Sequence, residues 1–186
     1  MAPSATDRVR RKVSVVPDAP AELGPRALQI VGAARELLEE EGADALTMRR
    51  LADRLGIKAP SLYKHFADKA ALEARLITLF FTELAAALEA APDFPGLAVA
   101  YRAYAMAHPH LYTLSTDRPL PRESLPPGLE ERAAWPLVRV LDGDEIRARA
   151  AWAFAHGMVV LEIAGRFPPG ADLDTTWRVG AAAFLR

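Results

Sequence analysis

The sequence predicts an all-α protein of about nine helices. Apolar residues recur at the three- and four-residue spacing of helices along most of the chain, and no strand-like alternation or Asn-Gly hairpin signal occurs. Fifteen prolines separate these periodic stretches, which favours helices divided by defined breaks. The 186 residues are enough for one large domain or two small ones with a real core.

The first 22 residues predict a disordered basic arm, because they mix Pro, Ala, Ser and Arg without periodicity. Their RVRRK run suits contact with DNA, and a plain solubilising tail is the alternative. No apolar segment follows these basic residues, and no run of eighteen uncharged apolar residues occurs, so we expect a cytoplasmic protein without a membrane span. The lack of cysteine excludes disulfides, zinc–thiolate sites and thiol catalysis.

Residues 47–69 are the centre of the predicted organisation. They are typical of two short helices joined by a turn, because Thr47 can cap the first, Gly56 permits the turn, and Pro60 suits the start of the second. Apolar residues at helical spacing give the two helices one shared buried face: Leu51, Ala52, Leu55, Ile57, Leu62 and Phe66. This is the helix-turn-helix pattern, whose second helix lies in the DNA major groove.

Basic residues are concentrated in the same stretch. Residues 45–69 hold six lysines and arginines against Asp53 and Asp68, an excess of four positive charges in a chain of net charge −1. DNA phosphates are neutralised by a local excess of this kind. Residues 71–186 are net acidic, so another function is expected there.

Two runs, LTMRRLA at 46–52 and LYKHF at 62–66, resemble the DNA-binding domain of the TetR family of bacterial repressors. Lys69 and Leu72 continue the resemblance. It implies a helix-turn-helix DNA-binding domain over residues 23–70 and a helical ligand-binding and dimerisation domain over residues 71–186.

The same resemblance implies roles for individual residues. Those that match phosphate contacts are Thr47, Tyr63, His65 and Lys69, and those that match residues facing base edges are Ala59, Pro60, Ser61 and Lys64. Lys58 stands where the family often has a serine, so the usual N-cap of the recognition helix is missing and Lys58 is expected to contact phosphate. Arg49 is a further candidate DNA contact because of its charge.

Helices are also expected outside the helix-turn-helix at residues 47–69. We expect helices over residues 25–41, 68–91, 94–108, 129–141 (kinked at Pro136), 144–167 and 173–185, a short apolar turn at 111–115 and an irregular loop at 116–128. In the family, the 68–91 helix joins the DNA head to the regulatory body. Asp172 or Asp174 is expected to cap the last helix.

Residues 107–112 (AHPHLY) and 151–167 (AWAFAHGMVVLEIAGRF) resemble the WHG class of TetR-type C-terminal domains, through Trp152, His156 and Gly157. Aromatic and histidine side chains of this half suit a pocket for a small apolar effector, although plain core is the commoner role of such rings. The candidate ligand-binding residues are Phe80, Tyr101, Tyr104, His108, Tyr112, Trp135, Trp152 and His156.

The last two helices are rich in alanine and glycine, which let helices approach closely, and family resemblance implies a homodimer through them. A two-fold dimer would place two recognition helices roughly 34–36 Å apart, or a multiple of that, on successive major grooves.

The leading hypothesis is a repressor that binds a palindromic operator and is released by an apolar effector. A DNA-binding protein without effector is the alternative. A metal-dependent hydrolase built on His108, His110, His156 and Glu162 lacks a nucleophile elbow and a metal-ligand spacing, so no enzyme activity, cofactor or metal is expected.

Overall fold

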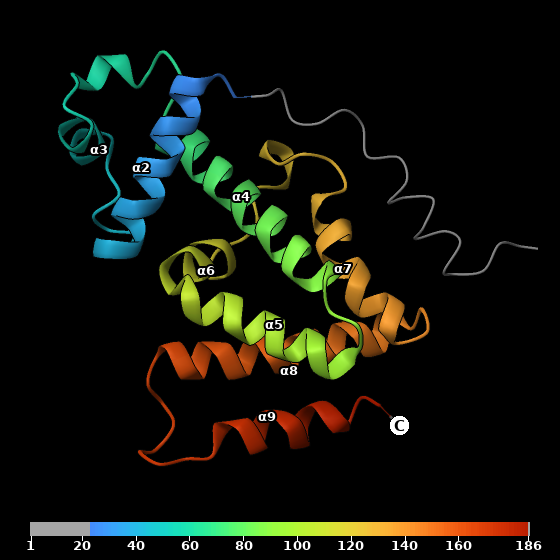
Figure 1. Cartoon of the computed structure of the whole chain (residues 1–186). Coiled ribbons are helices and arrows are strands. Elements are labelled where there is room, and N and C mark those ends of the chain that lie inside the picture. Colours follow the sequence, from blue (N-terminus) through green and yellow to red (C-terminus); the bar gives the residue numbers. More distant parts are fainter. Residues whose placement is uncertain (1–22, 186) are drawn as a thin grey trace, which may run out of the picture. The chain divides into compact units, whose positions relative to one another are not determined.

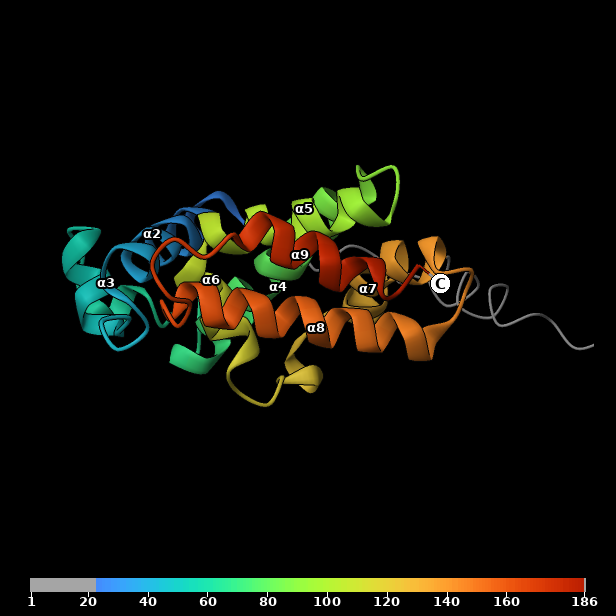
Figure 2. The same cartoon turned by 90° about the horizontal axis from the view of Figure 1, so that it is seen from below.

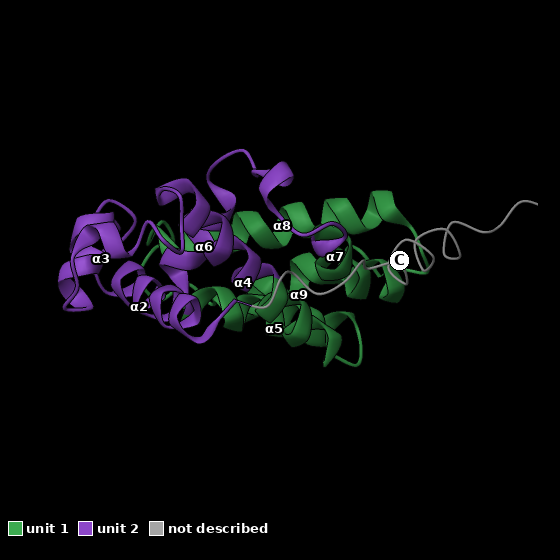
Figure 3. Ribbon diagram, turned by 90° about the horizontal axis from the view of Figure 1, so that it is seen from above, with its two compact units in different colours: residues 1–15, 82–107, 130–186 green, residues 16–81, 108–129 purple. Residues whose placement is uncertain are grey.

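A computed structural model describes residues 23–185, which form eight α-helices and two short 3-10 helices without any strand (Figure 1). The all-α prediction is confirmed for these residues, and the predicted arm at 1–22 lies outside them. The described residues group into two compact units (Figure 3). Unit 2 contains residues 23–81 and 108–129, and unit 1 contains residues 82–107 and 130–185. A domain boundary at residue 70 stays a prediction.

Unit 2 is built around helix α2 (Pro25–Glu41), which contacts both α3 (Met48–Arg54) and α6 (Pro109–Thr116). Pro25 is the first residue of α2. Its missing N–H costs no hydrogen bond there, because amides in the first turn have no partner within the helix. Gly42 ends it with φ +81°, a conformation that favours glycine. One face of α2 is buried, through Ala27, Ile30, Val31, Ala34, Leu37 and Leu38. The predicted range of this helix is therefore confirmed.

Helix α6 corrects the sequence-based expectation of a short turn at residues 111–115. Pro109 occupies its first turn, and Leu111 and Tyr112 are almost completely buried. Tyr112 packs edge-to-face against Phe80, with ring centroids 5.9 Å apart. Eight residues are too few for a helix that is stable alone, so α6 depends on this packing and on capping from elsewhere in unit 2.

The proline-rich segment that follows α6 is irregular, as predicted, apart from the short 3-10 helix η2 (Arg122–Ser124). It is nevertheless anchored, because Leu125 and Leu129 share a buried cluster with Ala74 and Ile77 of α4. Helix α4 (Lys69–Glu89) begins where the Asp68 carboxylate accepts a hydrogen bond from the Ala71 amide, at 2.7 Å. Its first part belongs to unit 2 and its last part to unit 1.

Unit 1 contains helices α5 (Phe94–Ala107), α7 (Leu129–Val140, except its first residue), α8 (Glu145–Ile163) and α9 (Leu173–Ala182). Helices α8 and α9 lie side by side and run in opposite directions, and both contact α5 (Figures 1 and 2). Their core consists of Phe94, Val138, Leu141, Ala148, Ala151 and Ala181. At Gly180 a Cβ atom would collide with the Phe154 ring, so glycine allows α9 to approach α8 this closely.

The two C-terminal helices are shorter than predicted. Helix α8 ends at Ile163, before Gly165 with φ +60°, and α9 ends at Ala182. Asp172 is the residue that caps α9, accepting from the Thr175 amide at 2.9 Å. Pro136 lies inside α7. None of the described helices combines the length and the apolar character needed to cross a membrane.

Candidate nucleic-acid interface

The first helix of the predicted pair is α3, and its start is fixed by Thr47. The Thr47 hydroxyl accepts a hydrogen bond from the Arg50 amide at 3.2 Å, which satisfies one donor of the first turn. Gly56 follows the helix with φ +64°, so the chain turns where glycine was predicted to permit it. Leu51 and Ala52 are buried, and they set the face on which the next segment packs.

The second helix of the pair is shorter than predicted, and this expectation was wrong in its detail. Residues 59–61 form the 3-10 helix η1, and residues 62–65 continue it as a hydrogen-bonded turn. Pro60 donates no backbone hydrogen bond, and Lys58 makes no side-chain cap, so the start of a regular helix is weakly supported. The amides of His65 and Phe66 both donate to the Leu62 carbonyl, at 2.9 and 3.0 Å. We call residues 58–66 the reading turn.

Burial divides the reading turn into an inner and an outer face. Leu62 is 0% exposed and Phe66 is 3% exposed, so these two side chains anchor the segment from beneath. The predicted DNA-binding residues that are exposed are Thr47, Arg49, Lys58, Pro60, Tyr63, Lys64 and His65, and those that are half-buried are Ala59, Ser61 and Lys69. The reading turn therefore presents polar and cationic groups on an apolar anchor.

The positive charge of this region is smaller than the sequence count suggested. Arg54 donates to both carboxylate oxygens of Glu40, at 2.6 and 2.8 Å, and to Glu36 at 3.2 Å. Arg50 is paired with Glu41. The hydrogen bonds to Glu40 and Glu36 raise the pKa of Arg54, and the bond from Arg54 lowers the pKa of Glu40. These two arginines hold α3 to α2, so they contribute little to the predicted excess.

Three cations remain directed outward. Within residues 23–185, no ion pair joins Arg49, Lys58 or Lys64 to a carboxylate. Lys69 differs, because its ammonium lies 3.4 Å from a Glu73 oxygen and 3.5 Å from the Ala43 carbonyl. The exposed positive charge is thus concentrated on the start of α3 and on the reading turn.

The predicted effector residues are divided between the two units. In unit 2, Phe80 packs against Tyr112, and a guanidinium nitrogen of Arg35 lies 3.2 Å from Nε2 of His108. In unit 1, the Tyr104 hydroxyl donates to Glu83 at 3.0 Å.

The remaining candidates, also in unit 1, differ in exposure. Tyr101 is buried and Trp135 packs on the core. Trp152 and His156 stack with ring centroids 5.7 Å apart, and Trp152 is 47% exposed. Two of these rings therefore pack in or against the core, and the other two form a stacked pair that is partly exposed to water.

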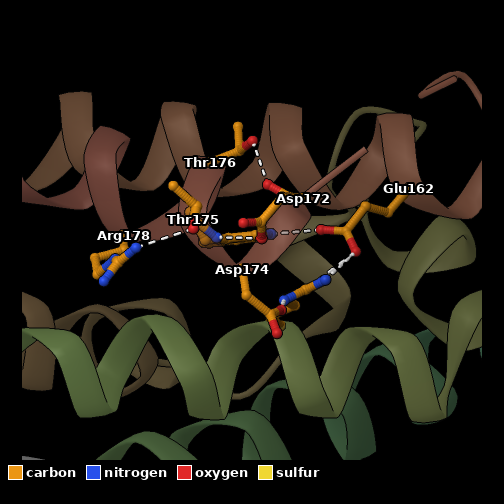
Figure 4. Close-up of polar contacts among 8 residues, drawn as sticks. Glu162, Asp172, Asp174, Thr175, Thr176 and Arg178 are labelled. Atoms are coloured by element: carbon orange, nitrogen blue, oxygen red, sulfur yellow. Dashed lines mark hydrogen bonds and ion pairs between the residues drawn. The ribbon is translucent and has the colours of Figure 1, made fainter. Parts of the chain in front are cut away.

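A buried polar cluster in unit 1 was not predicted. The Glu162 side chain is 5% exposed and accepts two hydrogen bonds from Arg102, at 2.8 and 3.0 Å, together with one from the Trp177 indole. Arg102 also pairs with Asp174 at 2.5 Å. Figure 4 shows the two carboxylates of this cluster, those of Glu162 and Asp174. Burial opposes the charge of Arg102, but the bonds to Asp174 and Glu162 outweigh it and raise its pKa. The cluster ties α5, α8 and α9 together, and its only signal in the sequence was that Glu162 is the one charged residue between Arg149 and Arg166.

The four residues of the hydrolase alternative do not all belong to one unit. His108 and His110 belong to unit 2, whereas His156 and Glu162 belong to unit 1. His108 lies beside Arg35, His156 stacks on Trp152, and Glu162 binds Arg102. In the part of the chain that the structure describes, no group of three histidine, aspartate or glutamate side chains is placed to hold a metal ion.

Helix α8 carries an apolar stripe on its outer face. The stripe follows the spacing of one helical face and consists of the exposed Ile146, Ala150, Ala153 and Val160 with the half-buried Gly157. Ile146 is 78% exposed, and on α9 Val179 is 66% exposed. At Gly157 an added Cβ would meet no atom within 4 Å.

The helix pair with its outward cationic turn defines a helix-turn-helix DNA-binding regulator. Residues 30–76 match the family described as "Bacterial regulatory proteins, tetR family", and residues 94–184 match the "Tetracyclin repressor-like, C-terminal domain". An uncharacterised HTH-type transcriptional regulator of Mycobacterium tuberculosis is 36% identical over an alignment of 190 positions, which covers 94% of this chain and 85% of that protein. The chain belongs to the TetR family. The WHG label stays a prediction.

Further likenesses agree with this assignment. The class A tetracycline repressor from transposon 1721 of Escherichia coli is 54% identical over 43 residues, 23% of this chain and 20% of that protein. A Rhodococcus sp. RHA1 protein of unknown function superposes with a TM-score of 0.70 at 27% identity, covering 90% of this chain and 97% of that one. A minocycline complex of a TetR variant from Acinetobacter baumannii AYE gives a TM-score of 0.60 at 24% identity, over 83% and 91%, a likeness of fold alone.

Proposed function

We propose that this protein is a cytoplasmic transcriptional repressor that binds a palindromic operator as a homodimer and is released by a small apolar effector. The observation that carries the proposal is the reading turn, in which Leu62 and Phe66 are buried while Tyr63, Lys64 and His65 are exposed. Polar and cationic groups on a firmly anchored segment suit contacts with phosphates and base edges. Membership of the TetR family supports the same reading.

The proposal assigns two kinds of DNA contact. Base edges are read by Ala59, Pro60, Ser61 and Lys64, and phosphates are contacted by Thr47, Arg49, Lys58, Tyr63, His65 and Lys69. Base contacts carry sequence preference, whereas phosphate contacts carry affinity and its salt dependence. Of the six proposed phosphate contacts, Lys69 alone is half-buried, and its ammonium lies beside Glu73.

Selection of duplexes from a random pool by the purified full chain tests this assignment. We expect a palindromic consensus, and Lys64→Ala or Ser61→Ala should relax preference at one position of each half-site. Tyr63→Phe should weaken all duplexes alike, and Lys58→Ala should lower the salt slope by about one. Arg118→Ala, an exposed change in the loop that follows α6, is the control. A uniform loss from Ser61→Ala and Lys64→Ala would refute the division of roles.

A second copy of the chain is the proposed occupant of the apolar stripe on α8. Small residues on that face allow close helix approach, and family membership implies dimerisation. Gly157→Leu should yield monomers in sedimentation, because its side chain has space within one subunit and would project into the partner. Gly32→Leu, at an exposed helical glycine that also has open space around its Cβ, should remain dimeric. A dimer that persists in Gly157→Leu would place the seam elsewhere.

A regulator without an effector is the second candidate, and the packing of Phe80 on Tyr112 favours it, because mutually buried rings already have partners. A thermal-shift screen of apolar compounds separates the two candidates. An effector must bind the free protein better than the operator complex, so a stabilising compound should also weaken operator binding. Stabilising compounds that leave operator affinity unchanged would favour the second candidate.

A further inference from the structure

The last two turns of α2 carry two pairs of charged residues that face different neighbours within unit 2. Arg35 and Glu39 are four residues apart and share one face, and Glu36 and Glu40 share the adjacent face, because residues i and i+4 are neighbours on a helix. The first pair contacts the start of α6, and the second contacts Arg54 of α3. The end of α2 therefore links α6 to the DNA-reading helices.

The contact with α6 is a cap supplied by another helix. One Glu39 oxygen accepts from the His110 amide at 3.2 Å, and the other accepts from the Leu111 amide at 3.0 Å. Amides in the first turn of a helix have no partner within the helix, and a carboxylate is favoured there by the helix dipole. His108, the residue at the cap position, makes no side-chain cap of its own, and Pro109 has no N–H to donate. Glu39 therefore performs the capping of α6 from 71 residues away.

Two further contacts make this junction specific. Arg35 approaches His108 from the same face of α2 as Glu39. A Cβ on Gly42 would lie 3.5 Å from the His110 ring, so the end of α2 and the start of α6 are in close contact. On the adjacent face, Glu40 engages Arg54 through both oxygens, which fixes α3 to the same two helical turns.

We propose that Glu39 is a positioning residue for operator binding. Its carboxylate holds the first turn of α6 against the end of α2, and the orientation of α3 and the reading turn is set from that same end. The inference rests on the proposed function and extends it, because it makes the position of α6 a determinant of how α3 and the reading turn are oriented. A shift at the start of α6 then changes operator affinity without any contact between α6 and DNA.

Operator affinity of Glu39 variants tests this inference. With the full chain and a duplex selected by the wild type, Glu39→Ala should weaken binding at least fivefold, about the lower end of typical coupling between sites. Glu39→Gln keeps one acceptor oxygen and should lose less. Hydrogen exchange at the His110 and Leu111 amides should become faster in both variants, which reports the loss of the cap directly. Glu123→Ala, an exposed change in the same unit, controls for net charge.

A purely structural role of Glu39 is separated by a second variant. Ile30→Val removes one buried methyl group from α2 and lowers stability without touching α6's cap. At a similar loss of thermal stability, Glu39→Ala should weaken the duplex complex and Ile30→Val should leave it within about twofold of the wild type. Equal losses in the two variants, or faster exchange with unchanged affinity in Glu39→Ala, would overturn the inference. A wild-type chain that selects no duplex would overturn the proposed function first.

Discussion

Polar clusters join the helices in both units, but the two clusters differ in how far their carboxylates are exposed to water. In unit 2 the carboxylates that hold Arg54 are open to water, with the Glu36 and Glu40 side chains 66% and 56% exposed. In unit 1 one of the two carboxylates that bind Arg102, that of Glu162, is only 5% exposed. Exposed pairs are screened and easily remade, whereas a buried charge that loses its partner is costly. Loss of one exposed pair should therefore cost unit 2 little stability, whereas the buried cluster gives unit 1 a fixed frame.

Removal of Glu162 should give the largest effect and tests the fixed character of unit 1. Glu162→Ala leaves the Trp177 indole N–H without its partner and Arg102 with Asp174 alone, so the free energy of unfolding should fall by about 3–5 kcal/mol. Denaturant unfolding followed by tryptophan fluorescence measures this, because Trp135, Trp152 and Trp177 all belong to unit 1.

Asp174→Ala is the matched control for that experiment. Asp174 binds the same arginine but its side chain is 90% exposed, so its loss should cost about 0–1 kcal/mol. Similar losses from Asp174→Ala and Glu162→Ala would remove the distinction between the buried and the exposed cluster.

Replacement of a glycine by alanine should lower stability in unit 1, at Gly180, and raise it in unit 2, at Gly32. Gly180→Ala places a methyl group into the Phe154 ring, and overpacking of this kind costs about 1–3 kcal/mol. Gly32→Ala in α2 meets no neighbouring atom, so the better helix propensity of alanine should stabilise by about 0.5–1 kcal/mol. Thermal unfolding of both variants checks the pair. Stabilisation by Gly180→Ala would mean that α9 shifts freely on α8, contrary to a fixed frame.

The sequence predicted those elements whose causes are local. Pro25 and Gly42 delimit α2, and Thr47 and Gly56 delimit α3, so their bounds followed from neighbouring residues. Helix α6 was predicted as a turn, because its cap is a carboxylate on another helix.

The candidate site was predictable to the same extent. The exposed face of the reading turn follows from Leu62 and Phe66, which apolar spacing had marked as buried. The sequence did not show that Arg50 and Arg54 are paired and therefore less available to DNA, because their partners lie on α2 and adjacency along the chain does not reveal them. The buried Glu162 was missed for the same reason.

Loss of the Thr47 cap should have a moderate effect, confined to unit 2. Thr47→Ala removes the acceptor of the Arg50 amide and should cost about 1 kcal/mol, with faster hydrogen exchange in the first turn of α3. Thr47→Ser keeps the hydroxyl and should restore both values. Faster exchange spreading to α8 or α9 would show that the two units do not respond separately.

The smallest effect is expected at Glu40, and its dependence on pH and salt gives the sharpest test of an exposed cluster. The hydrogen bond from Arg54 lowers the folded-state pKa of Glu40 below 4.5, so the contribution of this pair is fully present above that pH. It is lost as pH falls through the lowered folded-state value, because protonation then removes the charge. The difference in melting temperature between the wild type and Glu40→Gln should therefore be small near pH 7, shrink further in high salt, and vanish at strongly acidic pH. Glu131→Gln, an exposed change in α7, should show no such dependence. A difference that grows on acidification, or that resists salt, would mean that the Glu40–Arg54 pair behaves like the buried cluster of unit 1.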